Sequence, residues 1–277
     1  MVAMPVVLLL IAVPVLALVL WLAGQLAPVG ERDVAWLAGT AHLEPVEAEV
    51  YRRYLTRHRY HRLAGGAFGA AFAVVGIRWY GSVGIGSVQS TPAADLLFCT
   101  VAGVLAGALS AETFRLRTPA SGAAASLVRH AVPARPDLVH NARLVTGATV
   151  LIGVVAVLGG WGGGALAVAV GGLVVAAVAE ACRRSITERQ RPVLSSAADR
   201  VDRRLRGFAS GSIAYLELAA AVLTLMWTTS AAVAPAGTST DLEQVVDAVR
   251  AVVGLGGLVL AVVLLRRAAP RPRRGAP

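Results

Sequence analysis

The stretch LVTGATVLIGVVAVLGGWGGGALAVAVGGLVVAAVA, residues 144–179, carries no charged side chain. Its 36 residues are too many for one membrane-spanning helix, which needs about 20, and just enough for two short ones. The run GGWGGG, residues 159–164, interrupts it in the middle, and consecutive glycines break a helix. The stretch therefore predicts two spans, about 144–159 and 165–181, joined by a tight turn with Trp161 at the membrane–water interface.

The basic residues of the chain alternate with apolar stretches of this kind. All 26 are Arg, and none is Lys. Apart from Arg78 and Arg250, they fall into four blocks, at residues 32–62, 115–143, 183–206 and 266–274. Because positive charge in short loops stays on the cytoplasmic side of a membrane, we expect these blocks to face the cytoplasm. The connections between spans that carry no block are then expected to face outward.

This alternation predicts an all-α bundle of about seven transmembrane helices in one domain, residues 1–265, with the N-terminus outside and the C-terminus inside. The expected spans are residues 4–26, 63–81, 92–112, 144–159, 165–181, 207–228 and 245–265. The expected cytoplasmic loops are residues 27–62, 113–143 and 182–206. A disordered Arg- and Pro-rich tail is expected at residues 266–277.

A partial internal repeat suggests a more specific architecture. Shifting the third expected span onto the fifth matches Gly103 with Gly171 and Glu112 with Glu180. A repeat would make the fold one lone span followed by three outward hairpins. Chance matches are common between helices of such low complexity, so both interpretations stay open.

Composition supports a membrane location. Hydrophobic residues make up 56% of the chain and charged residues 15%, whereas soluble domains have about 45–50% and about 25%. The net charge is +10, which in a soluble protein would suggest nucleic acid. Here the Arg residues lie at the expected membrane edges, where they attract anionic headgroups. We therefore expect a multi-pass protein of the cell membrane that contacts anionic lipid and binds no nucleic acid.

The segment EPVEAEVYRRYLTRHRYHR, residues 44–62, precedes the second expected span and is basic and aromatic. It has two interpretations. A helix of this kind can lie in the headgroup layer, with contacts to lipid from Arg52, Arg53, Arg57, Arg59 and Arg62. Alternatively, it extends the second span into the cytoplasm as one continuous helix.

Ionisable residues within membrane spans are costly and are the first functional candidates. Glu217 is the strongest, because it lies about ten residues into the sixth expected span and so near the middle of the membrane. It could hold a proton or a cation, or anchor a ligand. The competing interpretation is a neutral carboxyl that is hydrogen-bonded to a neighbouring helix.

The other intramembrane candidates have stronger structural explanations. Arg78 and Asp95 could pair across the second and third spans, near the outer side. Glu112 and Glu180 each lie at a cytoplasmic helix end and precede an Arg by three residues, a spacing that predicts local ion pairs. Alternatively, these two carboxylates line a cytoplasm-facing cavity or bind a partner.

Several types of site have little support. His58 and His61 resemble half of a metal site, but no acidic or Cys cluster accompanies them, so we expect no metal. Cys99 and Cys182 are expected to be too far apart for a disulfide. We find no catalytic motif, and no cofactor is expected.

Small residues at four-residue spacing predict close helix contacts. Such pairs occur at Gly65 and Gly69 and at Gly103 and Gly107. Together with the sparse intramembrane charge and the short loops, they favour an accessory or scaffolding subunit that packs against a membrane-protein partner or its own copies. The alternative is a small transporter or channel that uses Glu217 as its coupling site. An enzyme acting on a lipid has weaker support.

Overall fold

The chain folds into helices that lie side by side. The computed structural model describes residues 28–40, 42–80, 92–113, 125–126, 135–161, 163–188, 191–192, 196–232 and 240–269. Within these ranges the seven helices are α2 (Glu31–Ala38), α3 (Pro45–Tyr80), α4 (Pro92–Thr113), α5 (Pro136–Leu158), α6 (Gly164–Glu188), α7 (Ser196–Ala231) and α8 (Thr240–Ala268). The described β-structure is one two-residue antiparallel pairing, β1 (Ala125–Ser126) with β2 (Arg191–Pro192). The expected first span and most of the expected tail lie outside the described residues.

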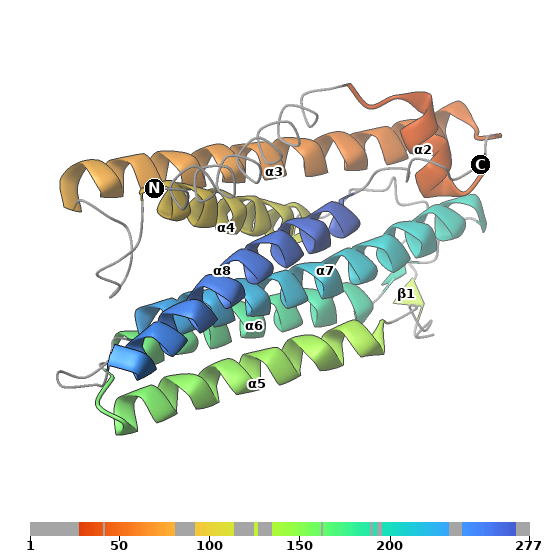
Figure 1. Cartoon of the computed structure of the whole chain (residues 1–277). Coiled ribbons are helices and arrows are strands. Elements are labelled where there is room, and N and C mark those ends of the chain that lie inside the picture. The colour runs from red at the N-terminus through yellow and green to blue at the C-terminus, as the bar shows by residue number, and fades with distance from the viewer. Residues whose placement is uncertain are drawn as a thin grey trace.

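Helices α3 to α8 form three consecutive antiparallel pairs. All three pairs turn at the same end of the bundle, the left end in Figure 1. We call it the turn end. The end of α4, the start of α5, the end of α6 and the start of α7 lie at the other end, together with α2. We call this the Arg-rich end, because described residues such as Arg143, Arg183 and Arg204 lie near it. The expected tight hairpin after Leu158 is present, and Gly160 adopts a positive φ of 76° there, which glycine permits.

Four of the helices are long and apolar enough to cross a membrane. The qualifying segments are Pro136–Leu158, Gly164–Thr187, Asp199–Ala231 and Thr240–Ala268. Helix α4 contains a shorter apolar segment, Cys99–Ala111. By length and composition these segments are candidate membrane spans, which supports a membrane protein.

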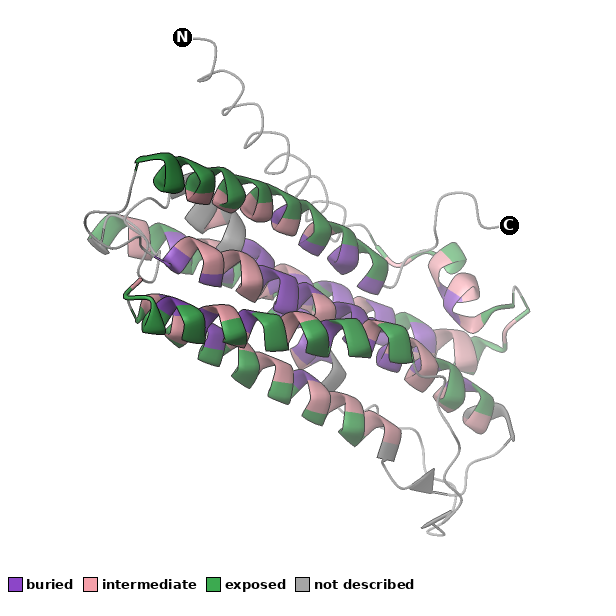
Figure 2. Cartoon of the chain, turned by 60° about the horizontal axis from the view of Figure 1, so that its bottom comes forward, coloured by how far each residue is buried: buried purple, intermediate pink, exposed green. Residues whose placement is uncertain are grey.

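Helix α7 is the centre of the bundle. In the most apolar 18-residue segment of α7, 78% of the residues are buried. In the corresponding segments of the other three candidate spans, 22–28% are buried. Helices α5, α6 and α8 each pack on α7, and α4 contacts it too. The outer helices turn large apolar side chains such as Leu151, Val174 and Val252 away from the core, and Figure 2 shows these exposed faces in green. Apolar faces of this extent suit a hydrocarbon environment rather than water.

Glycines bring α3 and α4 into backbone contact. A Cβ atom added to Gly65 would overlap the carbonyl oxygen of Gly103, and one added to Gly69 would overlap that of Cys99. The close helix contact predicted from the small-residue spacing is therefore confirmed. The suggested repeat does not extend to this packing, because a Cβ on Gly171 would meet nothing within 4 Å.

The basic segment before the second expected span is part of a longer helix. Helix α3 is continuous for 36 residues, which favours the extension over a separate helix in the headgroup layer. Its first half packs against α2 and the start of α7 in a second core that includes Leu37, Tyr54, Leu55 and Leu205. This second core lies at the Arg-rich end.

Candidate functional site: a buried glutamate beside an arginine network

Four Arg side chains donate hydrogen bonds to the C-terminal carbonyl groups of other helices. Arg62 of α3 reaches the end of α8, and Arg204 of α7 reaches Leu37 of α2. Arg206 of α7 donates to Ile186 of α6, and Arg250 of α8 donates to Ala232 just after α7. The last carbonyls of a helix lack partners within it and carry partial negative charge. A guanidinium satisfies both demands, so these contacts join the helices at both ends of the bundle.

Arg62 and Arg59 show that not every Arg of the basic segment is available to lipid. Arg62 is 0% exposed, and Arg59 is buried in an ion pair with Asp33 of α2 at 2.6 Å. The expected headgroup contact therefore does not hold for these two, because packing of α2 and α8 covers them. Arg52 and Arg53 are more exposed and bond Glu49, so contact with headgroups stays a prediction for them and for Arg57.

Glu217 lies inside the bundle. The residue is 3% exposed, and its Oε2 has no hydrogen-bond partner among the described residues. Its neighbours on α7, Leu216 and Ala219, belong to the main apolar core. Tyr215 lies beneath the guanidinium of Arg135, whose Cζ is 5.8 Å from the ring centroid. A buried carboxyl with an unsatisfied oxygen is unfavourable unless it holds a proton or a cation.

A second carboxylate lies within electrostatic range of Glu217. Glu180 of α6 binds Arg143 of α5 at 3.2 Å, Arg183 at 2.7 Å and Arg184 at 3.0 Å. The predicted local pairing of Glu180 with Arg183 is thus confirmed. We call these four residues the arginine–glutamate cluster. Arg143 and Arg183 attract the carboxylate of Glu217, and Glu180 repels it.

The packing of α6 on α7 sets the depth of Glu217. Gly172 of α6 lies against Thr224 of α7, and the two helices are antiparallel. Two turns along each helix, about seven residues, bring Glu217 level with residue 179, next to Glu180. Glu217 therefore lies level with the end of the uncharged stretch of α6, next to the Arg-rich end. Its place in the sequence suggested the middle of the sixth expected span.

Of the remaining candidates, those whose side chains the structure describes lie apart from this site. Arg78 is exposed near the turn end, and the side chains of Asp95 and Glu112 lie outside the described part of the chain, so their pairings stay predictions. His61 is 2.8 Å from the hydroxyl of Ser110, which ties α3 to α4. Among the described residues no group of three metal-binding side chains occurs.

The remaining features are the two cysteines and the ion-pair partners that the sequence did not predict. Cys99 is buried and Cys182 is half-buried, and no disulfide joins the two. Sequence reasoning missed Arg143 and Asp33 as partners, because each ion pair joins different helices. The only signal for Arg143 was its place at the edge of an uncharged stretch.

The arrangement defines a helical membrane protein with a buried carboxyl beside an ion-pair cluster. Chemically, this site can exchange a proton or a small cation. Comparisons with protein-family models, with curated proteins and with solved structures gave no match.

Proposed function

We propose that the protein is a polytopic membrane protein of about seven spans whose Arg-rich end faces the cytoplasm. The common turn end of the three helix pairs and the Arg residues at the opposite end support this orientation. In this arrangement the second and third spans are the apolar half of α3 and helix α4. The lone first span precedes the three hairpins.

We further propose that it acts as an accessory or scaffolding subunit of a membrane complex. The observation that carries this proposal is a stripe on the outer face of α3, which we call the α3 stripe. It consists of Phe68, Phe72, Val75 and Trp79, all exposed, at spacings of four, three and four residues. This spacing places them in one line along the helix, the pattern that a second helix packs against.

The packing of α4 on α3 strengthens the argument. It uses a neighbouring strip of small residues that includes Gly65 and Gly69. The large side chains of the stripe lie outside this contact, and Phe68 and Trp79 are each 74% exposed. The partner that fits this surface is a transmembrane helix of another protein.

A photo-crosslinking amino acid placed at position 72 tests the proposal in native membranes. We expect a discrete crosslinked membrane protein that disappears when Phe68→Ala and Trp79→Ala are introduced. The matched control places the probe at position 173, because Leu173 is exposed on α6 outside the stripe. Crosslinks to lipid alone at position 72, or the same protein captured at position 173, would contradict the proposal.

Glu217 supports a second candidate, a small transporter or channel coupled to protons. When Glu217 gains a proton, its attraction for Arg143 and Arg183 ends, and these side chains are left to Glu180 alone. When it loses the proton, it competes for the same guanidinium groups. A proton at Glu217 is thereby linked to the contacts of α5 and α6.

Proton flux into liposomes that contain the purified protein and an internal pH dye tests this candidate. We expect Glu217→Gln to abolish the flux while the variant remains folded by circular dichroism. Arg203→Gln is the control and should leave the flux unchanged, since Arg203 is exposed, pairs with Asp199 and lies outside the cluster. Equal flux in Glu217→Gln and in the wild type, or no flux in either, would contradict the coupling role.

A further inference from the structure

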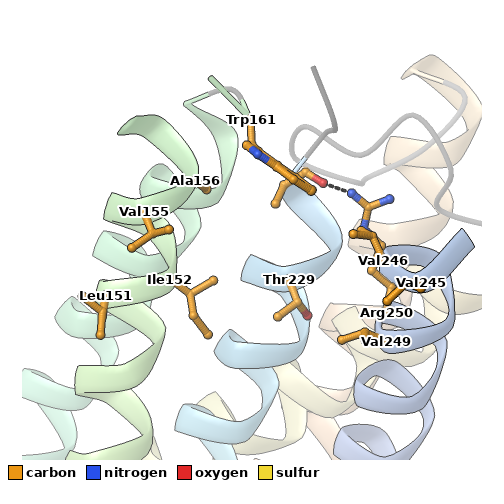
Figure 3. A pocket seen from close by; sticks show the side chains of 11 residues that line it. Leu151, Ile152, Val155, Ala156, Trp161, Thr229, Val245, Val246, Val249 and Arg250 are labelled. Carbon is orange, nitrogen blue, oxygen red and sulfur yellow. Dashed lines mark hydrogen bonds between the residues drawn. The ribbon is translucent and has the colours of Figure 1, made fainter. Parts of the chain in front are cut away.

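A lateral groove opens near the turn end of the bundle, far from the arginine–glutamate cluster. Helices α5 and α8 both pack on α7, and the groove between them has a volume of about 490 Å³. Ile152 and Val155 form one wall, Val245 and Val249 form the other, and Thr229 of α7 lies at the floor (Figure 3). The volume is within the range of ligand pockets, about 300–1,000 Å³.

The groove ends in a polar group at the level where the helices turn. Arg250 donates from Nη1 to Asp247 at 2.8 Å and from Nη2 to the carbonyl oxygen of Ala232. Its Nε is buried and has no hydrogen-bond partner among the described residues. Trp161 lies across the opening from Arg250 (Figure 3). A cation and an indole at one end of an apolar groove are typical of the interface between hydrocarbon and headgroups.

We propose that this groove holds an acyl chain of an anionic membrane lipid, with the headgroup phosphate at Arg250. The walls are apolar and continue into the exposed faces of α5 and α8, so a chain can enter sideways from the bilayer. Guanidinium groups bind phosphate through charge-assisted hydrogen bonds. Arg250 is 21% exposed, and its Nη1 and Nη2 each carry a second N–H beside the one donated to Asp247 or to Ala232. Asp247 shares Arg250, so the preference for an anionic over a neutral head is expected to be modest.

The dimensions favour a lipid chain over a partner helix. A helix with its side chains is about 10–12 Å in diameter, so a volume of this size would hold only about one turn of it. An acyl chain is much thinner and can follow the whole groove. The proposal concerns one lipid bound in a fixed place, in addition to the lipid that surrounds the bundle.

Native mass spectrometry of the purified chain tests the proposal, with phosphatidylglycerol and phosphatidylcholine of identical acyl chains added in turn. We expect one tightly held phosphatidylglycerol, and weaker binding of phosphatidylcholine. Val249→Trp, which fills the groove, is expected to lower the affinity about tenfold or more. Ile152→Trp fills the groove from the opposite wall and serves as an independent second variant.

Two controls separate this site from general lipid contact. Val252→Trp changes an exposed residue of α8 outside the groove and is expected to leave binding unchanged. Arg250→Gln is expected to remove the preference for phosphatidylglycerol, whereas Arg267→Gln at the other end of α8 is not. Equal lipid binding by the wild type and both groove-filling variants would overturn the proposal. A co-purifying protein that is lost in both variants, with no lipid held by the wild type, would overturn it in favour of a partner helix.

Discussion

The guanidinium of Arg62 lies 2.8 Å from the carbonyl oxygen of Ala268, joining residues that are 206 positions apart in the sequence. The same side chain donates to Leu265 at 3.2 Å, and the hydroxyl of Ser212 also bonds Ala268 at 2.9 Å. The end of α8 is thus held by α3 and α7 at once. This cap links the α3–α4 pair to the rest of the bundle, beside the second core and the contact of α4 with α7.

Replacement of Arg62 tests this link. Arg62→Met keeps much of the apolar volume but leaves the carbonyl of Leu265 without its donor. We expect a loss of about 1–3 kcal/mol in the free energy of unfolding, the cost of an unsatisfied buried acceptor. Chemical unfolding in detergent measures it. Arg52→Met removes a half-exposed Arg and should change stability little, so equal effects of the two variants would show that the cap contributes nothing.

The glycine contact between α3 and α4 gives a steric prediction. Gly69→Ala places a methyl group where the carbonyl of Cys99 lies, so the two helices must separate. We expect a lower melting temperature and easier proteolysis between α3 and α4. Gly171→Ala is the matched control, because its methyl group meets nothing within 4 Å and alanine is the better helix former. Tolerance of Gly69→Ala would mean that the helices are not in backbone contact.

His61 predicts a pH dependence of stability. Burial, with contributions from Arg57 and His58, lowers the pKa of His61 below its ordinary value. The unfolded chain therefore binds a proton more readily than the folded one. The stability of the α3–α4 contact is complete above the unfolded pKa, near 6.5, and falls as the pH drops through it toward the folded pKa.

Thermal unfolding at several values between about pH 5 and pH 8 measures this dependence. His61→Gln should flatten the curve in that range. His140→Gln, which removes an exposed His of α5, should leave the curve unchanged. A wild-type protein that is more stable at the acid end of the range would contradict the assignment.

The sequence predicted the helices and their grouping better than their contacts. The uncharged stretch with its glycine run predicted the α5–α6 hairpin, and the small-residue spacings predicted the α3–α4 contact. Both are properties of local sequence, namely helix length and side-chain size. The basic segment at residues 44–62 was ambiguous, because an amphipathic pattern suits both a headgroup-layer helix and a helix packed on protein.

The site was less predictable for a physical reason. Glu217 could be identified as a costly charge from its surroundings in the sequence alone. Its depth depends on the register of α6 against α7. The contact of Gly172 with Thr224 fixes that register, and this contact forms only in the folded chain. Arg62 gave no local sign that it would cap α8, since the carbonyls it binds come from the other end of the sequence.

The orientation of the bundle in the membrane underlies the proposed topology, and labelling of single cysteines tests it directly. In a background with Cys99→Ala and Cys182→Ala, Gly163→Cys and Asp241→Cys place thiols at the turn end, and Thr187→Cys and Ala269→Cys place them at the Arg-rich end. A membrane-impermeant maleimide should label the first two in intact cells and the last two only after permeabilisation. The reverse pattern, or labelling of one thiol from each end in intact cells, would contradict the proposed topology.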